Sequence, residues 1–518
     1  MYGVAAARPE AVNAGMHILE KGGNAFDAAI TVSLTLGVTE PFYSGLGGGG
    51  VSLLWNEKEK KISFIDFGNE CSSQVTSSMF DCDEDGKHLT NEHNRGYLSI
   101  LVPGLSKGLE SIHKKFCSMD WSILFEEPIK IARNGFKINS FYALQSNEKR
   151  FIEMLEQFPN LRKIHSKDGI PHKLGSLIKQ PELAESLDKI AKEGSEIFYN
   201  GKIGQLICKE MKKGNAPLNF DDLVSYKIRE PKPLEGEYEN LNYFTAPLPS
   251  CGLLLIQILN LFEIQRKKIK NLNELEFSLN LVKAMQIAFK DRFSLYGDPE
   301  FLEKDFDYLS TKEYARKLID SIKKLDVHNH DHEIGSTTHF TIIDKQGNAV
   351  CQTQTLGAAW GSGIIVPETG IILNNHTNWM DPRPNKPNSI LPGKRPIAGF
   401  APTFIFKKNK LQTAIGSPGS YRIPTAIAQV ILNQHHLKLN LSDAIKRKRI
   451  HCDIGPLYIE GEENDKLEEA LKKLKFKIIR NEYPSHFFGG IHAIEKLENG
   501  ELFACGDSRR DGSAMTKI

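Results

Sequence analysis

Length, composition and charge place this chain among ordinary soluble globular proteins. It has 518 residues, a formal net charge of +2, 40% hydrophobic residues and 25% charged residues, which is enough for a large core or for two or three domains. A net charge near zero gives no electrostatic argument for binding nucleic acid or an anionic membrane. The basic runs 267–270 and 446–449 are expected on solvated helix faces.

No signal peptide or membrane-spanning run is visible, which predicts a cytoplasmic protein or a chain whose leader has been removed. Eight scattered cysteines without a Cys-x-x-Cys pair favour reduced thiols over a disulfide framework or a zinc site. The histidines between His328 and His332 alternate in a polar stretch that reads as an exposed loop, without a rigid second shell. We therefore expect no metal and no cofactor.

The N-terminal part predicts two helices followed by a strand. Residues 10–22 have helical spacing, and Asn24 or Asp27 begins a second, nearly continuous apolar helix that runs to Val38. The glycine run 45–50 then precedes an apolar strand. A phosphate loop is not expected here, because no Gly-Lys-Ser/Thr follows and the order is helix, loop, strand. Close packing of the backbone explains these glycines better.

The rest of the chain divides into a helical middle, from about 100 to 330, and a strand-rich end after 337. Short β runs are predicted at 371–373, 403–406, 413–415, 491–494 and 502–504, and helices at 424–433 and 467–474. Strands at both ends of a chain with helices between them predict an α+β layered sandwich.

The stretch from Ser336 to Thr355 carries the strongest chemical signal. It reads as a hairpin that begins with small hydroxyl residues. If the chain is cut before Thr337, the new α-amino group lies beside its own hydroxyl and serves as the base that a threonine nucleophile needs. Thr355, across the hairpin, could hydrogen-bond the Thr337 hydroxyl and orient it. On this segment alone, an ordinary strand start explains the pattern better.

A second element is Gly416-Ser417-Pro418-Gly419-Ser420, between a β run and a helix. Successive backbone N–H groups at a helix N-terminus can stabilise an anion or oxyanion. A tight strand-to-helix turn explains the pattern equally well.

Taken together, these stretches resemble the γ-glutamyltransferase (γ-glutamyltranspeptidase, glutathione hydrolase) family of N-terminal-nucleophile hydrolases. Ordered motifs carry the resemblance nearly end to end: Leu19–Ala29, Gly45–Gly50, Val102–Gly104, Pro247–Gly252, Gly297–Pro299, Thr337–Phe340, Gly370–Asn375, Pro392–Pro396, Gly416–Gly419 and Asp507–Gly512. The resemblance implies a four-layer αββα sandwich and a chain that cleaves itself between Ser336 and Thr337.

The resemblance also implies how the chain is divided and which groups act. Segment 1–336, with a mixed α/β part, a helical middle and an exposed linker at about 326–336, would stay with segment 337–518 in one intertwined domain. This heterodimer could associate further. Thr337 would be nucleophile and base, Thr355 would orient it, and the N–H groups of Gly419 and Ser420 would form the oxyanion hole.

The positions that recognise the glutamyl group depart from the family pattern. The family arginine that binds the substrate carboxylate falls on Asn69 or, with another anchor, on Gly68. The resemblance gives a substrate role to six further positions: Gly357, His376, Asn378, Asp381, Ala398 and Gly399. At two places the residue types differ from the family: Gly357 replaces the usual Asn, and Ala398-Gly399 replaces a Ser-Ser pair. Asn378, Asp381, Arg383 and Arg395 could substitute for the lost groups.

Three functions remain open at this level. The first is hydrolysis of a γ-glutamyl or related amide through an acyl-enzyme, with transfer to water or to the amine of an amino acid or peptide. The second is an amidase or acylase with another acyl group. The third, of a different class, is an uncleaved binding or scaffold protein. None of the three involves nucleic acid or a membrane.

Overall fold

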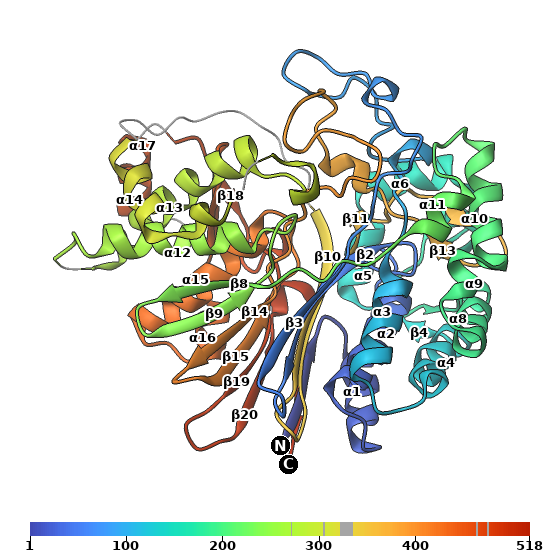
Figure 1. The fold of residues 1–518 in the computed structure, drawn as a ribbon, viewed down its shortest axis with the longest axis horizontal. Helices are drawn as coiled ribbons and strands as arrows, with labels where there is room; N and C mark the ends of the chain where they lie inside the picture. The colour runs from blue at the N-terminus through green and yellow to red at the C-terminus, as the bar shows by residue number, and fades with distance from the viewer. Residues whose placement is uncertain (271, 304–305, 322–334, 463–464, 474–475) are drawn as a thin grey trace.

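The computed structural model describes residues 1–518 except 271, 304–305, 322–334, 463–464 and 474–475. In this part of the chain, two six-stranded sheets lie face to face, and helices cover the outer face of each sheet (Figure 1). The strand order is β21-β1-β10-β11-β2-β3 in the first sheet and β20-β19-β15-β14-β9-β8 in the second. The layers are therefore helix, sheet, sheet and helix.

Neighbouring strands run antiparallel in both sheets. The first sheet consists of β1 (Tyr2–Ala6), β2 (Gly49–Asn56), β3 (Lys61–Phe67), β10 (Gly335–Ile343), β11 (Ala349–Ala358) and β21 (Ser513–Lys517). The second consists of β8 (Leu234–Tyr238), β9 (Leu241–Thr245), β14 (Thr403–Lys407), β15 (Lys410–Gly416), β19 (His492–Lys496) and β20 (Leu502–Gly506).

The helices fall into two groups, one on each side of the sandwich (Figure 1). The group beside the first sheet comprises α1 (Pro9–Glu20), α2 (Ala25–Thr39), α3 (Leu105–Phe116), α4 (Glu126–Asn134), α5 (Ser140–Ser146), α6 (Lys149–Gln157), α7 (Pro159–His165), α8 (Pro181–Glu193), α9 (Glu196–Tyr199), α10 (Lys202–Lys213) and α11 (Phe220–Ser225). The group beside the second sheet comprises α12 (Gly252–Arg266), α13 (Glu274–Leu295), α14 (Lys312–Ser321), α15 (Arg422–Leu437), α16 (Leu441–Lys446) and α17 (Asp465–Lys473).

The remaining strands are short and lie outside the two large sheets. They are β4 (Phe136–Lys137), β5 (Ser166–Lys167), β6 (Ile170–Pro171), β7 (Leu177–Ile178), β12 (Ile365–Val366), β13 (Ile371–Ile372), β16 (Ile450–Cys452), β17 (Leu457–Glu460) and β18 (Ile478–Asn481).

The two parts of the chain on either side of the Ser336–Thr337 bond are interleaved in both sheets. In the first sheet, β1 lies between β21 and β10, so the two chain termini are neighbours (Figure 1). In the second sheet, β8 and β9 from the first part continue the four strands of the second part. Separating the parts would break hydrogen-bonded ladders in both sheets.

Both faces of the first sheet are buried, which follows from the alternation of side chains along a strand. In β2, Leu54 packs into the core under α1 and α2, whereas Val51 and Leu53 pack into the core between the sheets. Trp55 reaches the second sheet directly, with its ring 5.1 Å from that of Phe406. β1, whose five residues are all buried, and the edge strand β3 were not predicted from the sequence.

The predicted helices at the N-terminus are confirmed. Asn24 is the N-cap of α2: its side chain accepts from the N–H of Asp27 at 2.9 Å, and the Asp27 carboxylate accepts from the N–H of Asn24 at 2.8 Å. This capping box decides between the two predicted starts. The prediction of close backbone packing at the glycine run is also confirmed. A Cβ atom on Gly47 would lie 2.1 Å from the carbonyl oxygen of Ile372, and a Cβ atom on Gly48 would lie 2.2 Å from the carbonyl oxygen of Thr355.

Two expectations about the surface need correction. Arg449 in the basic run is 2% exposed, because it forms an ion pair of 2.6 Å with Asp507 inside the protein. Within the predicted exposed linker, Ser336 is 1% exposed and lies in β10, paired with Gly357; the stretch 326–334, with the histidine cluster, lies outside the described residues.

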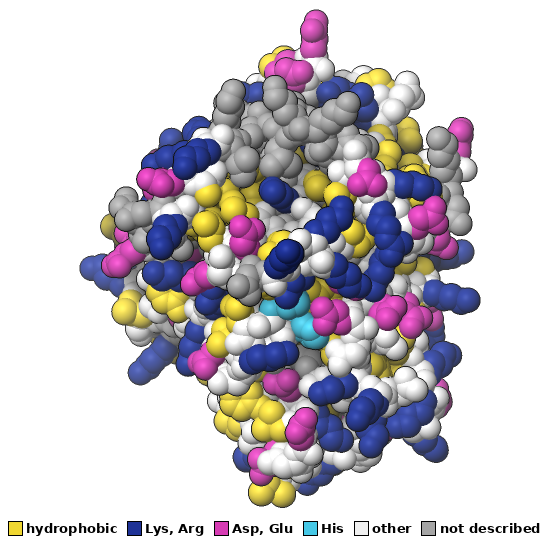
Figure 2. All heavy atoms as spheres, turned by 90° about the vertical axis from the view of Figure 1, so that its left-hand side faces the viewer, with side chains coloured by type: hydrophobic (Ala, Val, Ile, Leu, Met, Phe, Trp, Pro, Cys, Tyr) yellow, Lys and Arg dark blue, Asp and Glu magenta, His cyan; other side chains and the backbone are white. Residues whose placement is uncertain are grey.

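No helix in the described ranges is long and apolar enough to cross a membrane. On the face shown in Figure 2, lysine and arginine side chains are interspersed with acidic ones.

Candidate active site

The Ser336–Thr337 bond is buried inside β10. Thr337 is 1% exposed, and the register between β10 and β11 shifts between Ser336 and Thr338. The Thr337 hydroxyl donates to the carbonyl oxygen of Ser336, 2.7 Å away. The hydroxyl is thus held against the carbonyl group that it must attack if the chain cleaves itself.

A second hydroxyl reaches the same carbonyl oxygen. The Thr355 hydroxyl, on β11, also donates to the oxygen of Ser336 and accepts from the N–H of Gly357 at 2.9 Å. The sequence predicted that Thr355 hydrogen-bonds the Thr337 hydroxyl; in this uncleaved chain it contacts the Ser336 carbonyl instead. The Thr355 hydroxyl polarises this carbonyl and would stabilise the negative charge that develops on its oxygen while the Thr337 hydroxyl attacks.

Arg510 contacts the residue after the scissile bond and was missed as a functional residue. Its Nη1 donates to the carbonyl oxygen of Thr337 at 3.4 Å, and its Nε and Nη2 donate to that of His486 at 3.2 and 3.1 Å. Its guanidinium also lies over the Tyr43 ring, 5.0 Å from the centroid. The run Asp507–Gly512 was noted in the sequence, but only the fold brings Arg510 to Thr337.

Glu40 at the end of α2 is a second buried group that the sequence did not single out. It is 1% exposed, and neither carboxylate oxygen has a hydrogen-bond partner among the described residues. Burial raises the pKa of Glu40 to about 7, and the positive charge of Arg8 offsets only part of this effect. A carboxyl group with a raised pKa therefore lies close to Thr337, since Thr338 is among its neighbours.

Several predicted substrate residues line one small pocket, which we call the acyl pocket. Its lining residues are Val51, Asp66, Gly68, Asn69, Pro249, Ser250, His376, Trp379, Arg395, Pro396, Ala398 and Phe400, and its volume is about 10 Å³. That volume holds roughly one water molecule. The pocket is therefore nearly closed in the uncleaved chain.

Three buried polar atoms of the acyl pocket have no hydrogen-bond partner in the described part of the chain: Asn69 Oδ1, His376 Nε2 and Arg395 Nε. Unsatisfied buried polar groups are rare in native proteins and each needs an explanation. A ligand that supplies the missing partners is one. Burial also lowers the pKa of His376 to about 3, so this imidazole is neutral at pH 7.

Arg395 supplies the positive charge of the acyl pocket and is rigidly held. Its Nη1 lies 3.0 Å from a carboxylate oxygen of Asp66, and its Nη2 lies 3.6 Å from one of Glu70. Nearby carboxylates keep its pKa high in spite of burial. Its Nη atoms are thus committed to acidic and carbonyl partners, while its Nε remains for a ligand.

Glycines connect the acyl pocket to the scissile bond. Gly357, the partner of Ser336, has a φ of +105°, and a Cβ there would lie 2.9 Å from His376 Cδ2. Gly49 pairs with Thr355, and its Cβ would lie 2.2 Å from Asn69 Oδ1. His376 and Asn69 of the pocket therefore lie against Gly357 and Gly49. These two glycines pair with Ser336 and Thr355.

The loop before α15 lies at the same site. Gly419 and Ser420 have φ values of +132° and +55°, and the latter is uncommon for a residue with a side chain. Neither N–H donates a hydrogen bond within the described residues. A Cβ on Gly399 would lie 2.2 Å from the carbonyl oxygen of Ser420, so this loop touches the Ala398–Gly399 side of the acyl pocket. Free N–H groups at a helix start suit an oxyanion.

Four of the seven residues predicted to bind substrate do not line the acyl pocket: Gly357, Asn378, Asp381 and Gly399. Asp381 forms a two-point ion pair with Arg383, at 3.0 Å to Nε and 2.8 Å to Nη2. Asn378 lies in the 3₁₀ turn His376–Trp379 and donates its N–H to Asn375. Asp381 and Arg383 thus satisfy each other.

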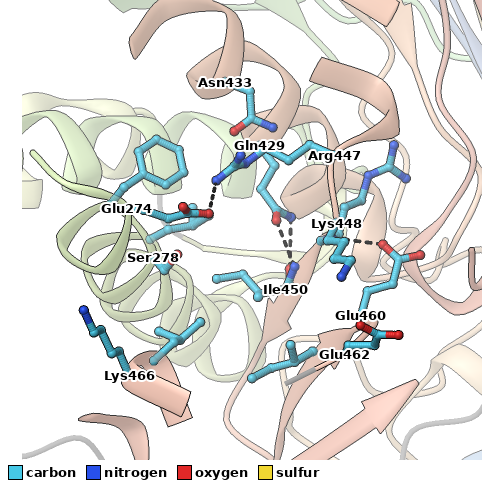
Figure 3. Close-up of a pocket in the computed structure, with 15 residues that line it drawn as sticks. Glu274, Ser278, Gln429, Asn433, Arg447, Lys448, Ile450, Glu460, Glu462 and Lys466 are labelled. Atoms are coloured by element: carbon cyan, nitrogen blue, oxygen red, sulfur yellow. Dashed lines mark hydrogen bonds and ion pairs between the residues drawn. The ribbon is translucent and has the colours of Figure 1, made fainter. Parts of the chain in front are cut away.

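A much larger cavity, of about 640 Å³, lies elsewhere between α13, α15, β16, β17 and α17 (Figure 3). Arg447 and Glu274 form an ion pair of 2.7 Å at its rim. None of the predicted site residues lines it. We place the chemistry at the smaller pocket because its residues Asn69 and His376 lie against Gly49 and Gly357, which pair with Thr355 and Ser336 in the sheet.

The layered fold and the buried threonine inside β10 define an N-terminal-nucleophile hydrolase. A solved cephalosporin acylase from Bacillus halodurans has the same fold, with a TM-score of 0.89, 22% identity and coverage of 99% of this chain and 95% of that one. The αββα fold class predicted from the sequence is confirmed.

The chain belongs to the γ-glutamyltranspeptidase family, whose model matches residues 11–517. It is 31% identical to the glutathione hydrolase proenzyme of Escherichia coli (strain K12), over 98% of this chain and 90% of that protein. It is also 30% identical to the acylase ACY 1 proenzyme of Pseudomonas sp. (strain V22), over 98% of this chain and 92% of that protein. The chain is thus an enzyme of the γ-glutamyltransferase type.

Proposed function

We propose that this protein is a self-processing threonine hydrolase and acyltransferase that cleaves a γ-glutamyl amide and transfers the acyl group to water or to an amine. The observation that carries the substrate assignment is the set of three unsatisfied polar atoms in the acyl pocket. Its relatives in the family include a glutathione hydrolase, which supports the same assignment.

Maturation uses atoms that are already in place. The Thr337 oxygen attacks the Ser336 carbonyl carbon, and the negative charge on the carbonyl oxygen is stabilised by the Thr355 hydroxyl. The C–N bond then breaks, the nitrogen takes the proton from the hydroxyl, and an ester remains between Ser336 and Thr337. Water hydrolyses this ester, leaving a carboxylate on Ser336 and a free α-amino group on Thr337.

Turnover repeats this chemistry on a substrate. The new α-amino group takes the proton of the Thr337 hydroxyl, whose oxygen attacks the substrate carbonyl. The N–H groups of Gly419 and Ser420 stabilise the oxyanion, the amide C–N bond breaks, and the leaving amine takes the proton. Water or an acceptor amine then attacks the ester and releases Thr337.

Recognition follows from whether each unsatisfied atom donates or accepts a hydrogen bond. A substrate α-carboxylate would accept from Arg395 Nε, and a substrate α-ammonium group would donate to Asn69 Oδ1. These partners would take the place of the arginine that the family pattern has at position 69 or, with the other anchor, at position 68. Cleavage would release Ser336 from Gly357, which lies against His376, and we propose that this release opens the nearly closed pocket.

A second candidate is an acylase for an uncharged acyl group. The observation that favours it is the apolar side of the pocket: the neutral His376 ring stacks on Trp379 at 4.2 Å, and Trp379 lies 6.0 Å from Phe400. The related acylase ACY 1 proenzyme is consistent with such a change of acyl group.

The test is intact mass under denaturing conditions, followed by turnover of four anilides. γ-Glutamyl anilide carries both charged groups, glutaryl anilide lacks the amine, 4-aminobutyryl anilide lacks the carboxylate, and butyryl anilide lacks both. We expect two chains, the second beginning at Thr337, and the highest kcat/KM for γ-glutamyl anilide. A preference for butyryl anilide would favour the acylase, and one unbroken chain without turnover would favour a binding or scaffold protein.

A further inference from the structure

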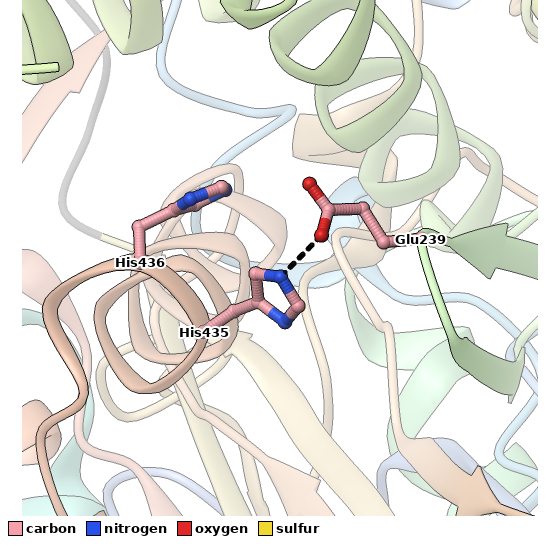
Figure 4. A group of neighbouring side chains, drawn as sticks. All are labelled: Glu239, His435 and His436. Atoms are coloured by element: carbon pink, nitrogen blue, oxygen red, sulfur yellow. Dashed lines mark hydrogen bonds and ion pairs between the residues drawn. The ribbon is translucent and has the colours of Figure 1, made fainter. Parts of the chain in front are cut away.

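The three potential ligands Glu239, His435 and His436 come together at the edge of the second sheet, away from the acyl pocket (Figure 4). In the described part of the chain they form the one group of three such residues, and their ligand atoms all lie within 4.8 Å of one another. Glu239 lies in the turn between β8 and β9, with a φ of +50°. The two histidines lie in the last turn of α15.

We propose that Glu239, His435 and His436 bind a zinc-class divalent transition-metal ion. Two imidazole nitrogens and a carboxylate oxygen form a ligand set that zinc prefers, with water in the fourth position. Calcium and magnesium prefer ligands that are all oxygen. In a tetrahedral zinc site, ligand atoms lie about 3.4 Å apart, so the group must contract. The Glu239 side chain is 39% exposed and His435 17% exposed, so both have room to adjust and the ion can enter from solvent.

Tyr238 supplies an outer contact of the kind that metal-binding histidines need. Its hydroxyl lies 2.6 Å from His436 Nε2, and the tyrosine itself is fully buried. Histidine ligands commonly donate their second ring N–H to a fixed acceptor, which sets the ring orientation and the tautomer. The Tyr238 oxygen can accept from Nε2 and leave Nδ1 of His436 for the metal.

Within the group, His435 and Glu239 contact each other directly through a hydrogen bond. His435 Nε2 lies 2.5 Å from a carboxylate oxygen of Glu239 (Figure 4), and the two histidine ring centroids lie 4.8 Å apart. An ion pair alone would need a cation at position 435 but no imidazole, and it would not need His436. This difference separates a metal site from a surface ion pair.

The proposed ion would join the two parts of the chain. Tyr238 and Glu239 precede the Ser336–Thr337 bond, whereas His435 and His436 follow it. In the processed protein the ion would therefore cross-link two chains, a consequence that rests on the proposed self-processing. Because α15 has 16 residues, its last turn lies roughly 20 Å from the oxyanion loop at its start. We thus expect an effect on the stability of the assembly and not on the chemistry.

Metal binding itself is tested on the full chain after EDTA treatment and dialysis, by titration with ZnCl₂ in a calorimeter and with CoCl₂ by visible absorption. We expect one ion per chain. His436→Gln and His435→Lys should abolish binding, although lysine keeps a cation beside Glu239. Tyr238→Phe should weaken binding roughly tenfold, as the loss of an outer contact does. His17→Gln, on α1, is the matched control and should bind normally.

Absence of binding, or binding that His435→Lys and His436→Gln leave unchanged, overturns the proposal. The cross-link is tested separately by the urea concentration at which the two processed chains separate, with and without ZnCl₂. The uncleaved Thr337→Ala protein should bind zinc equally well, so failure of processing is distinguished from failure of the metal site. If zinc binds but does not raise that urea concentration in the processed protein, the cross-link is wrong and the site stands.

Discussion

The surroundings of the scissile bond and the acyl pocket lie on either side of the same strand, β11, but their polar groups are satisfied differently. The Ser336 carbonyl oxygen already accepts from two hydroxyls. In the acyl pocket, Asn69, His376 and Arg395 each keep a buried polar atom without a partner within the described residues. The attack that begins self-processing needs only atoms of the chain itself, so the groups for this step are in place before cleavage. Substrate binding needs atoms from outside, so its site is complete only with a ligand.

The largest effect is expected from removing the nucleophile. Thr337→Ala should abolish both cleavage and turnover, because no other hydroxyl can form the ester. Thr337→Ser keeps a hydroxyl at the same place and should still cleave. Intact mass over several days reports the outcome; cleavage at the same bond in the Thr337→Ala protein would remove Thr337 from its assigned role.

The next effect concerns Thr355, whose hydroxyl donates a hydrogen bond to the Ser336 carbonyl oxygen. Thr355→Ala should slow the appearance of the chain that begins at Thr337 by about 10²–10³-fold, the usual cost of one oxyanion donor. Thr355→Ser should restore most of the rate. The rates are measured by gel densitometry after expression in a cell-free system, and an unchanged rate in Thr355→Ala would mean that the Thr355 contact is only structural.

A third prediction concerns the dependence of stability on pH. Folding raises the pKa of Glu40 from 4.5 to about 7, so the folded chain holds this proton more tightly than the unfolded chain does. The resulting stabilisation is full below pH 4.5 and is lost as the pH rises through 7. The glutamine in Glu40→Gln cannot lose a proton. Over this pH range the free energy of unfolding of this variant should therefore fall by about 3 kcal/mol less than that of the parent protein.

This prediction is checked by urea unfolding at several pH values in the uncleaved Thr337→Ala background, where one chain unfolds. Glu498→Gln, at an exposed position, is the control and should follow the parent protein. Parallel curves for Glu40→Gln and the parent would show that Glu40 is charged throughout.

The smallest effect is expected in the acyl pocket. Asn69→Leu removes the proposed acceptor for the substrate ammonium group and should raise the KM for γ-glutamyl anilide roughly tenfold or more, the loss of a hydrogen bond to a charged group. Glutaryl anilide, which lacks the amine, should show an unchanged KM. An equal rise for both substrates would mean that Asn69 shapes the pocket without contacting the amine.

Local patterns were enough to predict part of this molecule. The capped helix at Asn24, the hairpin after Thr337 and the helix after Ser420 follow from periodicity and turn chemistry, which depend on neighbours in the sequence. The resemblance to a family added the four-layer αββα form of the predicted sandwich and the expected role of Thr337 as nucleophile. The strands β1 and β21 have no such signal, because they are identified only by pairing between the two ends of the chain.

The sequence by itself determined the fold class and the family and was enough to propose Thr337 as the nucleophile, because these depend on residue type and order. Only the tertiary structure decided that Arg510 contacts Thr337, that Glu40 is buried beside it, that Arg395 enters the acyl pocket and that Asp381 does not. It also brought Glu239 to His435 and His436. Each of these contacts joins residues that are distant in the sequence, and their burial and pairing depend on how two sheets and two helix layers pack together.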